Sequence, residues 1–282
     1  MKHIYTNFKR FDVPIAFGGV NRIADIDSWA ERIAVLTQKP LSRYTDCEFV
    51  MFFPEAHLLS AKAVLDEGSP IILGCQGLMH EDIQTGGNFG AFTSSLPAAA
   101  ARALGCGYAL IGHCEERRSK RSIMLEAGAS EKNADRAINR LLNKEIIAAV
   151  NRGLKVLYCI GEKEAELDIW QEVLTDQIGI GLDGVEKSQV VIAYEPIWSI
   201  GPGKIAADKS YITKIGRFVK RITNNMDMVY GGGLKEGNAE MLASIDEIDG
   251  GLIALTRFSG EIGFYPDEYL NIVELYLRGK SK

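Results

Sequence analysis

The sequence lacks the features of an exported or membrane-spanning protein. No run of 18 apolar residues occurs, and the first residues include no apolar stretch of signal-peptide length, so no transmembrane helix is expected. The five cysteines are odd in number, widely spaced and free of any C-x-x-C pair, a pattern typical of reduced thiols. These absences predict a cytoplasmic protein without a membrane partner.

A strong excess of one charge is also missing. The 32 Lys and Arg residues and 37 Asp and Glu residues give a formal net charge of −5. Only residues 117–121 form a basic cluster, and it is interpreted as a solvated loop or helix start. Nucleic-acid-binding domains carry a larger basic stripe, so no nucleic-acid partner is expected.

Motifs for metals and for several common cofactors do not occur either. No His/Cys/Asp/Glu group has metal-ligand spacing, and neither G-x-S-x-G nor G-x-x-x-x-G-K-[ST] is present. The sequence therefore predicts no metal site and no bound cofactor.

What the chain does contain is a large apolar fraction arranged in short segments. Of its 282 residues, 46% are hydrophobic, enough to build a core without disulfides or metals. Eight segments rich in β-branched or aromatic residues are nearly continuous in hydrophobicity, as strands buried on both faces are. They are residues 4–6, 49–53, 71–73, 108–111, 156–160, 190–194, 228–230 and 252–255.

Helical periodicity occupies the stretches between most of these segments. Residues 135–152 carry an apolar stripe closed by Gly153, and 97–104 and 210–222 have similar patterns. Strand followed by helix, eight times, predicts an α/β fold of the (β/α)₈ TIM-barrel type, with residues 1–282 as a single domain. A doubly wound sheet is the main alternative, but it favours a Gly-rich turn after the first strand, where residues 7–10 read Asn-Phe-Lys-Arg.

Polar residues follow the predicted strands, at the barrel end where such folds carry their chemistry. They are Asn7, Lys9, Gln76, His113, Glu115, Glu116, Glu162, Glu195, Thr256 and Arg257, together with the glycines 231–233. Function is therefore expected at one rim of the barrel.

Three of these residues indicate proton transfer next to a carbonyl. Glu195 ends an apolar strand, where a general base is favoured over a buried structural carboxylate. His113 suits a neutral electrophile or general acid, and Lys9 supplies a positive charge for an anionic substrate or developing enolate. Residues 196–204 contain Pro and Gly hinges around Ile197 and Trp198, which is typical of a closing loop.

The glycines at 231–233 have two readings. Uncovered backbone N–H groups form nests that bind phosphate, but a tight turn explains three glycines equally well.

At this point the sequence resembles the triosephosphate isomerase family from Asn7 to about Asp249. The family's Asn-Trp-Lys stands as Asn-Phe-Lys at 7–9, and its Gly-His-Ser-Glu-Arg-Arg as Gly-His-Cys-Glu-Glu-Arg-Arg at 112–118. Cys-Ile-Gly-Glu occupies 159–162. The most specific match is Ala-Tyr-Glu-Pro-Ile-Trp-Ser-Ile-Gly-Pro-Gly-Lys at 193–204.

The resemblance implies an aldose–ketose isomerase of carbohydrate metabolism, in glycolysis and gluconeogenesis. It implies Glu195 as base, His113 as neutral electrophile, and Lys9 with Asn7 supporting the substrate oxygens; a glutamate base paired with a neutral imidazole is documented for that family. It also implies an obligate homodimer or higher oligomer, because Gly-Ala-Phe-Thr, ending at Thr93, matches the segment that reaches a neighbouring subunit's site.

Departures from the family concentrate where the phosphate would bind. Tyr-Gly-Gly-Ser is replaced by Tyr-Gly-Gly-Gly at 230–233, and the Gly-Gly after strand eight aligns with Ala254 and Leu255. Two interpretations follow. In one, Gly201, Gly232 and Gly233 donate N–H groups to phosphate, Thr256 also binds the substrate, and Arg257 replaces lost contacts. In the other, the pocket is rebuilt for a tetrulose phosphate such as L-erythrulose 1-phosphate.

The favoured function is isomerisation of a small phosphorylated sugar, dihydroxyacetone phosphate and glyceraldehyde 3-phosphate, through an enediolate. A catalytically silent barrel that binds a phosphosugar is an alternative, motivated by the altered loop after strand eight. A divalent-metal aldose isomerase is a third, disfavoured by the missing ligand set.

Overall fold

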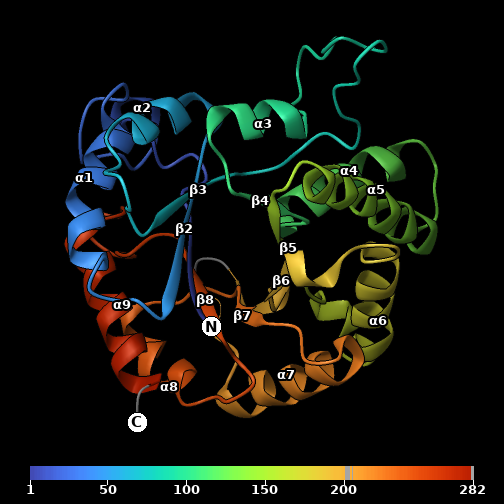
Figure 1. Ribbon diagram of the computed structural model, residues 1–282. Helices are drawn as coiled ribbons and strands as arrows, with labels where there is room; N and C mark the ends of the chain where they lie inside the picture. Colours follow the sequence, from blue (N-terminus) through green and yellow to red (C-terminus); the bar gives the residue numbers. More distant parts are fainter. Residues whose placement is uncertain (201–203, 205, 281–282) are drawn as a thin grey trace.

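Eight parallel strands form a closed barrel in the computed structural model, which describes residues 1–200, 204 and 206–280 (Figure 1). Each strand pairs with its neighbours in sequence, and β1 pairs with β8 to close the ring. The strands are β1 Lys2–Asn7, β2 Cys47–Phe53, β3 Ile71–Cys75, β4 Tyr108–Ile111, β5 Lys155–Ile160, β6 Val190–Tyr194, β7 Met228–Tyr230 and β8 Gly250–Ile253. The predicted (β/α)₈ fold is confirmed.

Helices surround the barrel on its outside (Figure 1). They are α1 Trp29–Leu41, α2 Leu58–Ala63, α3 Ala98–Leu104, α4 Cys114–Glu126, α5 Glu131–Asn151, α6 Trp170–Gly181, α7 Lys209–Thr223, α8 Ala239–Ala243 and α9 Pro266–Lys280. Short 3₁₀ turns at Ile15–Phe17, Glu55–His57, Glu164–Glu166, Lys187–Gln189, Ile197–Ser199 and Glu236–Asn238 connect them.

The apolar side chains divide into two cores because residues alternate across each strand. One set fills the inside of the barrel and includes Tyr5, Phe52, Leu157 and Val229. The larger set lies between the strands and the helices. Inside the barrel, Gly74 leaves room for Phe52, since a Cβ there would stand 2.4 Å from the ring.

The last strand differs from its prediction. It was expected at 252–255 and lies at Gly250–Ile253. A Cβ on Gly250 would meet the His3 carbonyl oxygen at 1.8 Å, so close packing against β1 requires glycine here. Because glycine is depleted in strands, hydrophobicity alone placed this strand two residues late.

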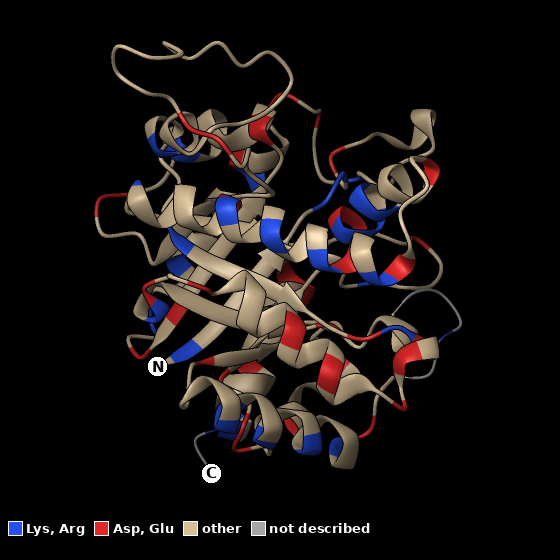
Figure 2. Cartoon of the chain, turned by 90° about the vertical axis from the view of Figure 1, so that its right-hand side faces the viewer, with Lys and Arg blue, Asp and Glu red and all other residues tan. Residues whose placement is uncertain are grey.

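Two segments are longer than a simple barrel needs. The connection 77–97 projects from the barrel between β3 and α3 (teal in Figure 1), and residues 83–97 carry no charged side chain. Figure 2 shows the outer part of this projection in tan at the top of the view, without acidic or basic positions. The second segment joins β8 to α9 and folds back on itself through an antiparallel bridge between Arg257 and Gly263.

No helix in the described part of the chain is both long and apolar enough to cross a membrane.

Candidate active site

His113 lies directly after β4 and forms the N-cap of α4. Its Nδ1 accepts the backbone N–H of Glu115 at 3.3 Å. An acceptor nitrogen carries no proton, so the neutral ring has its hydrogen on Nε2. That nitrogen lies 3.2 Å from Glu195 Oε1. The start of α4 thus selects the tautomer that presents an N–H toward Glu195.

Glu195 follows β6, and its carboxylate is almost completely buried, at 2% exposed. Its Oε2 accepts the backbone N–H of Cys114 at 2.9 Å. Burial raises the pKa of Glu195, and His113 and the Cys114 N–H partly oppose that shift. A carboxyl group held this way can take up a proton more readily than an exposed one, as a general base must.

Lys9 reaches the same region from the end of β1. Its backbone is left-handed, with φ of +45°, a conformation that a lysine adopts only when its surroundings impose it. Its N–H donates to Asn7 Oδ1 at 3.0 Å, and its ammonium pairs with Glu115 at 2.8 Å. Burial acts to raise the pKa of Glu115, but the Lys9 ammonium outweighs it and the net shift is downward.

Gln76 follows β3, and the structure shows what its side chain contacts. Its side-chain amide donates to Lys9 O at 3.1 Å, Phe52 O at 3.2 Å and Asn7 Oδ1 at 3.3 Å. Three acceptors on one donor group hold the strained turn of Lys9 against β2. No motif in the sequence signals this contact, because it depends on the neighbouring strands.

Glu162, at the end of β5, connects the segment after Glu195 to α7. Its buried Oε1 accepts hydrogen bonds from Tyr194 at 2.8 Å, Trp198 Nε1 at 2.8 Å and Tyr211 at 3.0 Å. Trp198 belongs to the expected closing loop, whose Gly201 lies outside the described residues. Glu162 therefore fixes the first part of that loop.

Close contacts explain two of the three glycines after β7, and backbone conformation explains the third. A Cβ on Gly231 would lie 2.8 Å from Glu195 Cγ, and one on Gly232 would lie 2.4 Å from the Tyr230 ring. Gly233 has φ of +96°, where other residues are strained. Within the described part of the chain, the amides of Gly232 and Gly233 donate no hydrogen bond, so both N–H groups are available to an anion.

Thr256 and Arg257 are engaged with α9. Thr256 Oγ1 donates to Glu268 at 2.8 Å and accepts the Tyr265 N–H at 2.9 Å. Arg257 Nε donates to Glu268 at 2.8 Å, and its guanidinium lies 3.9 Å from the centre of the Tyr265 ring. These contacts hold the hairpin between β8 and α9 in place.

His113, Cys114 and Glu195 also bring three potential metal ligands within 4.8 Å of one another, which no spacing in the sequence indicates. A metal on His113 Nε2 would have to displace the proton that α4 keeps there. Burial, together with the charge of Glu195, raises the pKa of the Cys114 thiol to about 12, and a protonated thiol is a poor ligand. The group is better suited to proton transfer than to metal binding.

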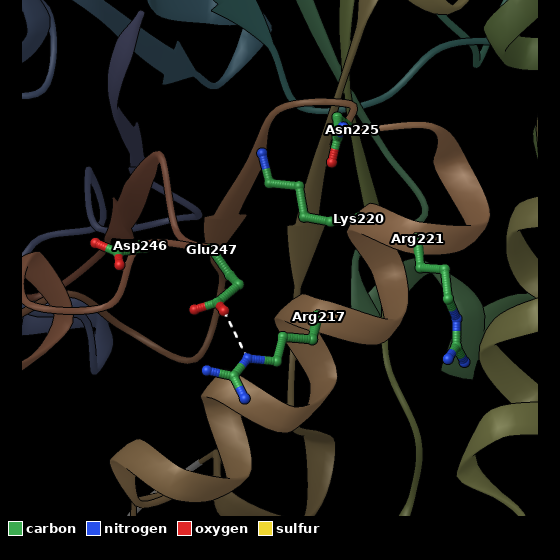
Figure 3. A pocket seen from close by; sticks show the side chains of 6 residues that line it. All are labelled: Arg217, Lys220, Arg221, Asn225, Asp246 and Glu247. Atoms are coloured by element: carbon green, nitrogen blue, oxygen red, sulfur yellow. Dashed lines mark hydrogen bonds and ion pairs between the residues drawn. The ribbon is translucent and has the colours of Figure 1, made fainter.

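A separate hollow of about 490 Å³ lies at the opposite end of the barrel, between α7 and the residues before β8 (Figure 3). Its lining is Arg217, Lys220, Arg221, Asn225, Asp246 and Glu247. Arg217 pairs with Glu247 at 2.8 Å (Figure 3), and Lys220 pairs with Asp249 at 2.5 Å. Arg217 and Lys220 are thus paired with carboxylates, whereas Arg221 lies over the Phe218 ring.

A base, an imidazole N–H and a lysine thus converge at the carboxyl ends of the strands, and the comparisons identify the family with this arrangement. A family model described as triosephosphate isomerase matches residues 23–262. The chain belongs to the triosephosphate isomerase family.

Similar proteins in this family cover most of the chain. Triosephosphate isomerase of Dictyoglomus thermophilum is 32% identical over 244 residues, which are 82% of this chain and 87% of that protein. The enzyme of Clostridium novyi is 33% identical over 228 residues, covering 76% and 82%. The crystal structure of triosephosphate isomerase from Bartonella henselae has the same fold, with a TM-score of 0.70 at 23% identity, covering 98% of this chain and 99% of that one.

Proposed function

We propose that this member of the triosephosphate isomerase family interconverts dihydroxyacetone phosphate and glyceraldehyde 3-phosphate, with Glu195 as base and His113 as electrophile. The observation that carries the proposal is the separation of 3.2 Å between Glu195 Oε1 and His113 Nε2, with both residues buried. Glu195 would take a proton from a substrate carbon, and His113 would donate a hydrogen bond to the carbonyl oxygen next to it.

In the first step, Glu195 removes a proton from the carbon next to the carbonyl, and the electron pair moves onto the carbonyl oxygen to give an enediolate. The same carboxyl group then returns the proton to the neighbouring carbon. His113 donates its Nε2 hydrogen to the substrate oxygen and moves the hydroxyl proton between the two oxygens. Glu195 must release the Cys114 N–H to reach the carbon.

Negative charge on the enediolate is balanced by Lys9. The ammonium already pairs with Glu115 at 2.8 Å, so it is held in place before substrate binds. Asn7 fixes the Lys9 backbone through its 3.0 Å hydrogen bond. Preorganised charge of this kind costs no reorganisation during the reaction.

The phosphate is assigned to the free amides of Gly232 and Gly233, with Gly201 from the closing loop. Thr256 and Arg257 contribute by holding the hairpin 254–265 at the edge of this nest through Glu268. Backbone N–H groups suit a phosphate dianion because they carry partial positive charge without a competing counter-ion.

A homodimer is assigned through the projection 77–97. Thr93 is exposed on it, and Phe89 at its end is 81% exposed. A loop whose residues 83–97 carry no charge and which presents a phenylalanine to water is typical of a protein interface. The projection would reach the site of a second copy of the chain.

The proposed chemistry is tested by turnover of both triose phosphates with Glu195→Gln and Glu195→Asp. Removing the base should lower kcat by about 10³-fold, and shortening it should lower kcat by about 10²-fold, because proton transfer requires close approach. Glu172→Gln, an exposed carboxylate on α6, is the control. Unchanged turnover in both Glu195 variants would overturn the proposal.

A four-carbon substrate remains the second candidate, favoured by Gly233 in place of the family's serine and by Ala254 and Leu255 after β8. Turnover of erythrulose phosphates, measured beside the trioses with inhibition by inorganic phosphate, decides between them. A kcat/KM at least tenfold higher for a tetrulose phosphate would reassign the substrate. Absence of turnover on every sugar phosphate would instead indicate the silent binding protein, and loss of activity with a chelator the metal-dependent isomerase.

A further inference from the structure

We propose that Glu116 is a positioning residue for His113, and that it acts as one half of a proton-sharing carboxyl pair with Glu145 on α5. The inference rests on the proposed function, because it assigns a consequence for turnover to residues that do not touch the substrate.

Gly112, the residue before His113, is held at both of its backbone polar groups, its N–H and its carbonyl. Glu116 Oε2 accepts the Gly112 N–H at 2.6 Å, and Arg117 Nε donates to the Gly112 carbonyl at 2.8 Å. Gly112 itself has φ of +81°, so this turn depends on its contacts more than on an intrinsic backbone preference. Two successive side chains of α4 thus fix the backbone immediately before His113.

Glu116 is in turn held by a lysine that it shares. Lys120 pairs with Glu116 one helical turn away and with Glu145 at 2.8 Å. Glu145 is 2% exposed, and its Oε2 finds no hydrogen-bond partner in the described part of the chain. Two carboxylates therefore face one ammonium; the Glu145 carboxylate is buried, whereas the side chains of Glu116 and Lys120 are 20% and 24% exposed.

Such a group is neutral only if it binds one proton. Two carboxylates and one lysine carry a net charge of −1, which is costly to bury, whereas a proton on the pair removes that charge. Burial, followed by the charge of Glu116, raises the pKa of Glu145 to about 8. Arg117, which follows Glu116 in the sequence, is also charged, and its guanidinium donates to Asn139 at 2.8 Å and Tyr158 at 3.0 Å.

Loss of this proton would weaken the hold on Gly112. Once both carboxylates are ionised they repel each other and compete for Lys120, so Glu116 no longer has a fixed partner. His113 would then lose its defined position, and the distance from its Nε2 to the substrate oxygen would vary. We expect kcat to fall and KM to stay nearly unchanged, because the phosphate is assigned to residues 232–233 and not to His113.

The first test is the split between kcat and KM at pH 7. Glu116→Ala should lower kcat about tenfold and leave KM within twofold, because it removes the acceptor of the Gly112 N–H but no substrate contact. Glu116→Gln keeps an acceptor oxygen and should recover most of the loss. Glu126→Ala, an exposed carboxylate at the end of α4, is the control. A kcat within twofold of wild type for Glu116→Ala would overturn the proposal, as would equal losses in Glu116→Ala and Glu116→Gln.

The second test is the pH profile, which a merely structural role would not change. Wild-type kcat should fall above about pH 8, and Glu145→Gln, which imitates the protonated carboxyl at every pH, should remove that decline while leaving kcat at pH 7 within twofold. The same decline in both proteins would exclude the shared proton. Since wild-type turnover is measured alongside, failure of this inference is distinguishable from failure of the proposed function.

Discussion

At Glu145, burial and the neighbouring carboxylate both oppose ionisation of the side chain. Its pKa is raised to about 8, whereas an exposed glutamate releases its proton near pH 4.5. Between these values the unfolded chain has lost a proton that the folded chain retains. Glu145 therefore reduces stability progressively as pH rises through this window, and the reduction is complete above about pH 8.

We predict that Glu145→Gln becomes more stable than the wild type as pH rises. The difference in unfolding free energy should grow by roughly 1.4 kcal/mol for each pH unit between about 5 and 8, because glutamine has no proton to lose. Urea denaturation at pH 5, 6, 7 and 8 measures it. Glu172→Gln, on the surface of α6, should show no such slope. Parallel stability curves for Glu145→Gln and wild type would contradict the prediction.

At Lys9, the backbone conformation that lysine prefers conflicts with the conformation that the site imposes. A positive φ at a lysine costs of order 1 kcal/mol or more, and three neighbouring groups impose it: Asn7 through the N–H, Gln76 through the carbonyl and Glu115 through the ammonium. Strain that is held this firmly fixes the position of a charged group, which is what stabilisation of an enediolate requires.

At the scale of secondary-structure elements, the hairpin between β8 and α9 is held in place by α9. Its attachment depends on Glu268, which binds both Thr256 and Arg257. The stacking of Arg257 on Tyr265 adds a second contact. The position of this end of the pocket is therefore decided by a helix that follows it in the sequence.

We predict that Arg257→Gln and Glu268→Gln have the same effect. Each should raise KM for glyceraldehyde 3-phosphate roughly fivefold with kcat nearly unchanged, because each releases the hairpin beside the phosphate nest. The double variant should be no worse than either single variant, since both changes remove one ion pair. Steady-state kinetics of the three variants test this, with Arg278→Gln, in an exposed pair on α9, as control. A large KM increase in Arg257→Gln alone would instead indicate direct contact with phosphate.

At the scale of the whole molecule, the projection 77–97 extends away from the barrel and leaves its outer part exposed. Its base is fixed, because Asp82 accepts the Ala99 N–H at the start of α3 at 2.9 Å and also pairs with Arg152. Its outer part is uncharged and exposes Phe89. A rigid base with an apolar end is suited to insertion into a second subunit.

We predict that Phe89→Glu converts a dimer into monomers. A buried carboxylate without a partner would cost several kcal/mol at the interface, and kcat should fall with dimer dissociation if Thr93 completes the neighbouring site. Light scattering after size-exclusion chromatography, repeated across a range of concentrations, measures the mass against the 31.0 kDa of one chain. Ile169→Glu, another exposed apolar position, should leave the dimer intact. A monomeric wild type would refute the assignment.

The sequence by itself determined the order of elements and the end of the barrel at which polar residues gather. Continuous hydrophobicity marks strands buried on both faces, and this signal is local, so it could be read without coordinates. Strands β4 and β6 lie at Tyr108–Ile111 and Val190–Tyr194, as expected. Helix α5 was expected at 135–152 but begins at Glu131, because its polar first turn shows no apolar period.

Only the tertiary structure decided how these residues contact one another. Three contacts join residues that lie apart in the sequence: Gln76 with Lys9, Glu268 with Arg257, and Glu145 with Lys120. No local sequence pattern encodes such pairs. The tautomer of His113 likewise depends on the exact start of α4. Sequence fixes which chemical groups are available, but hydrogen bonds and burial depend on distances that arise only when the barrel closes.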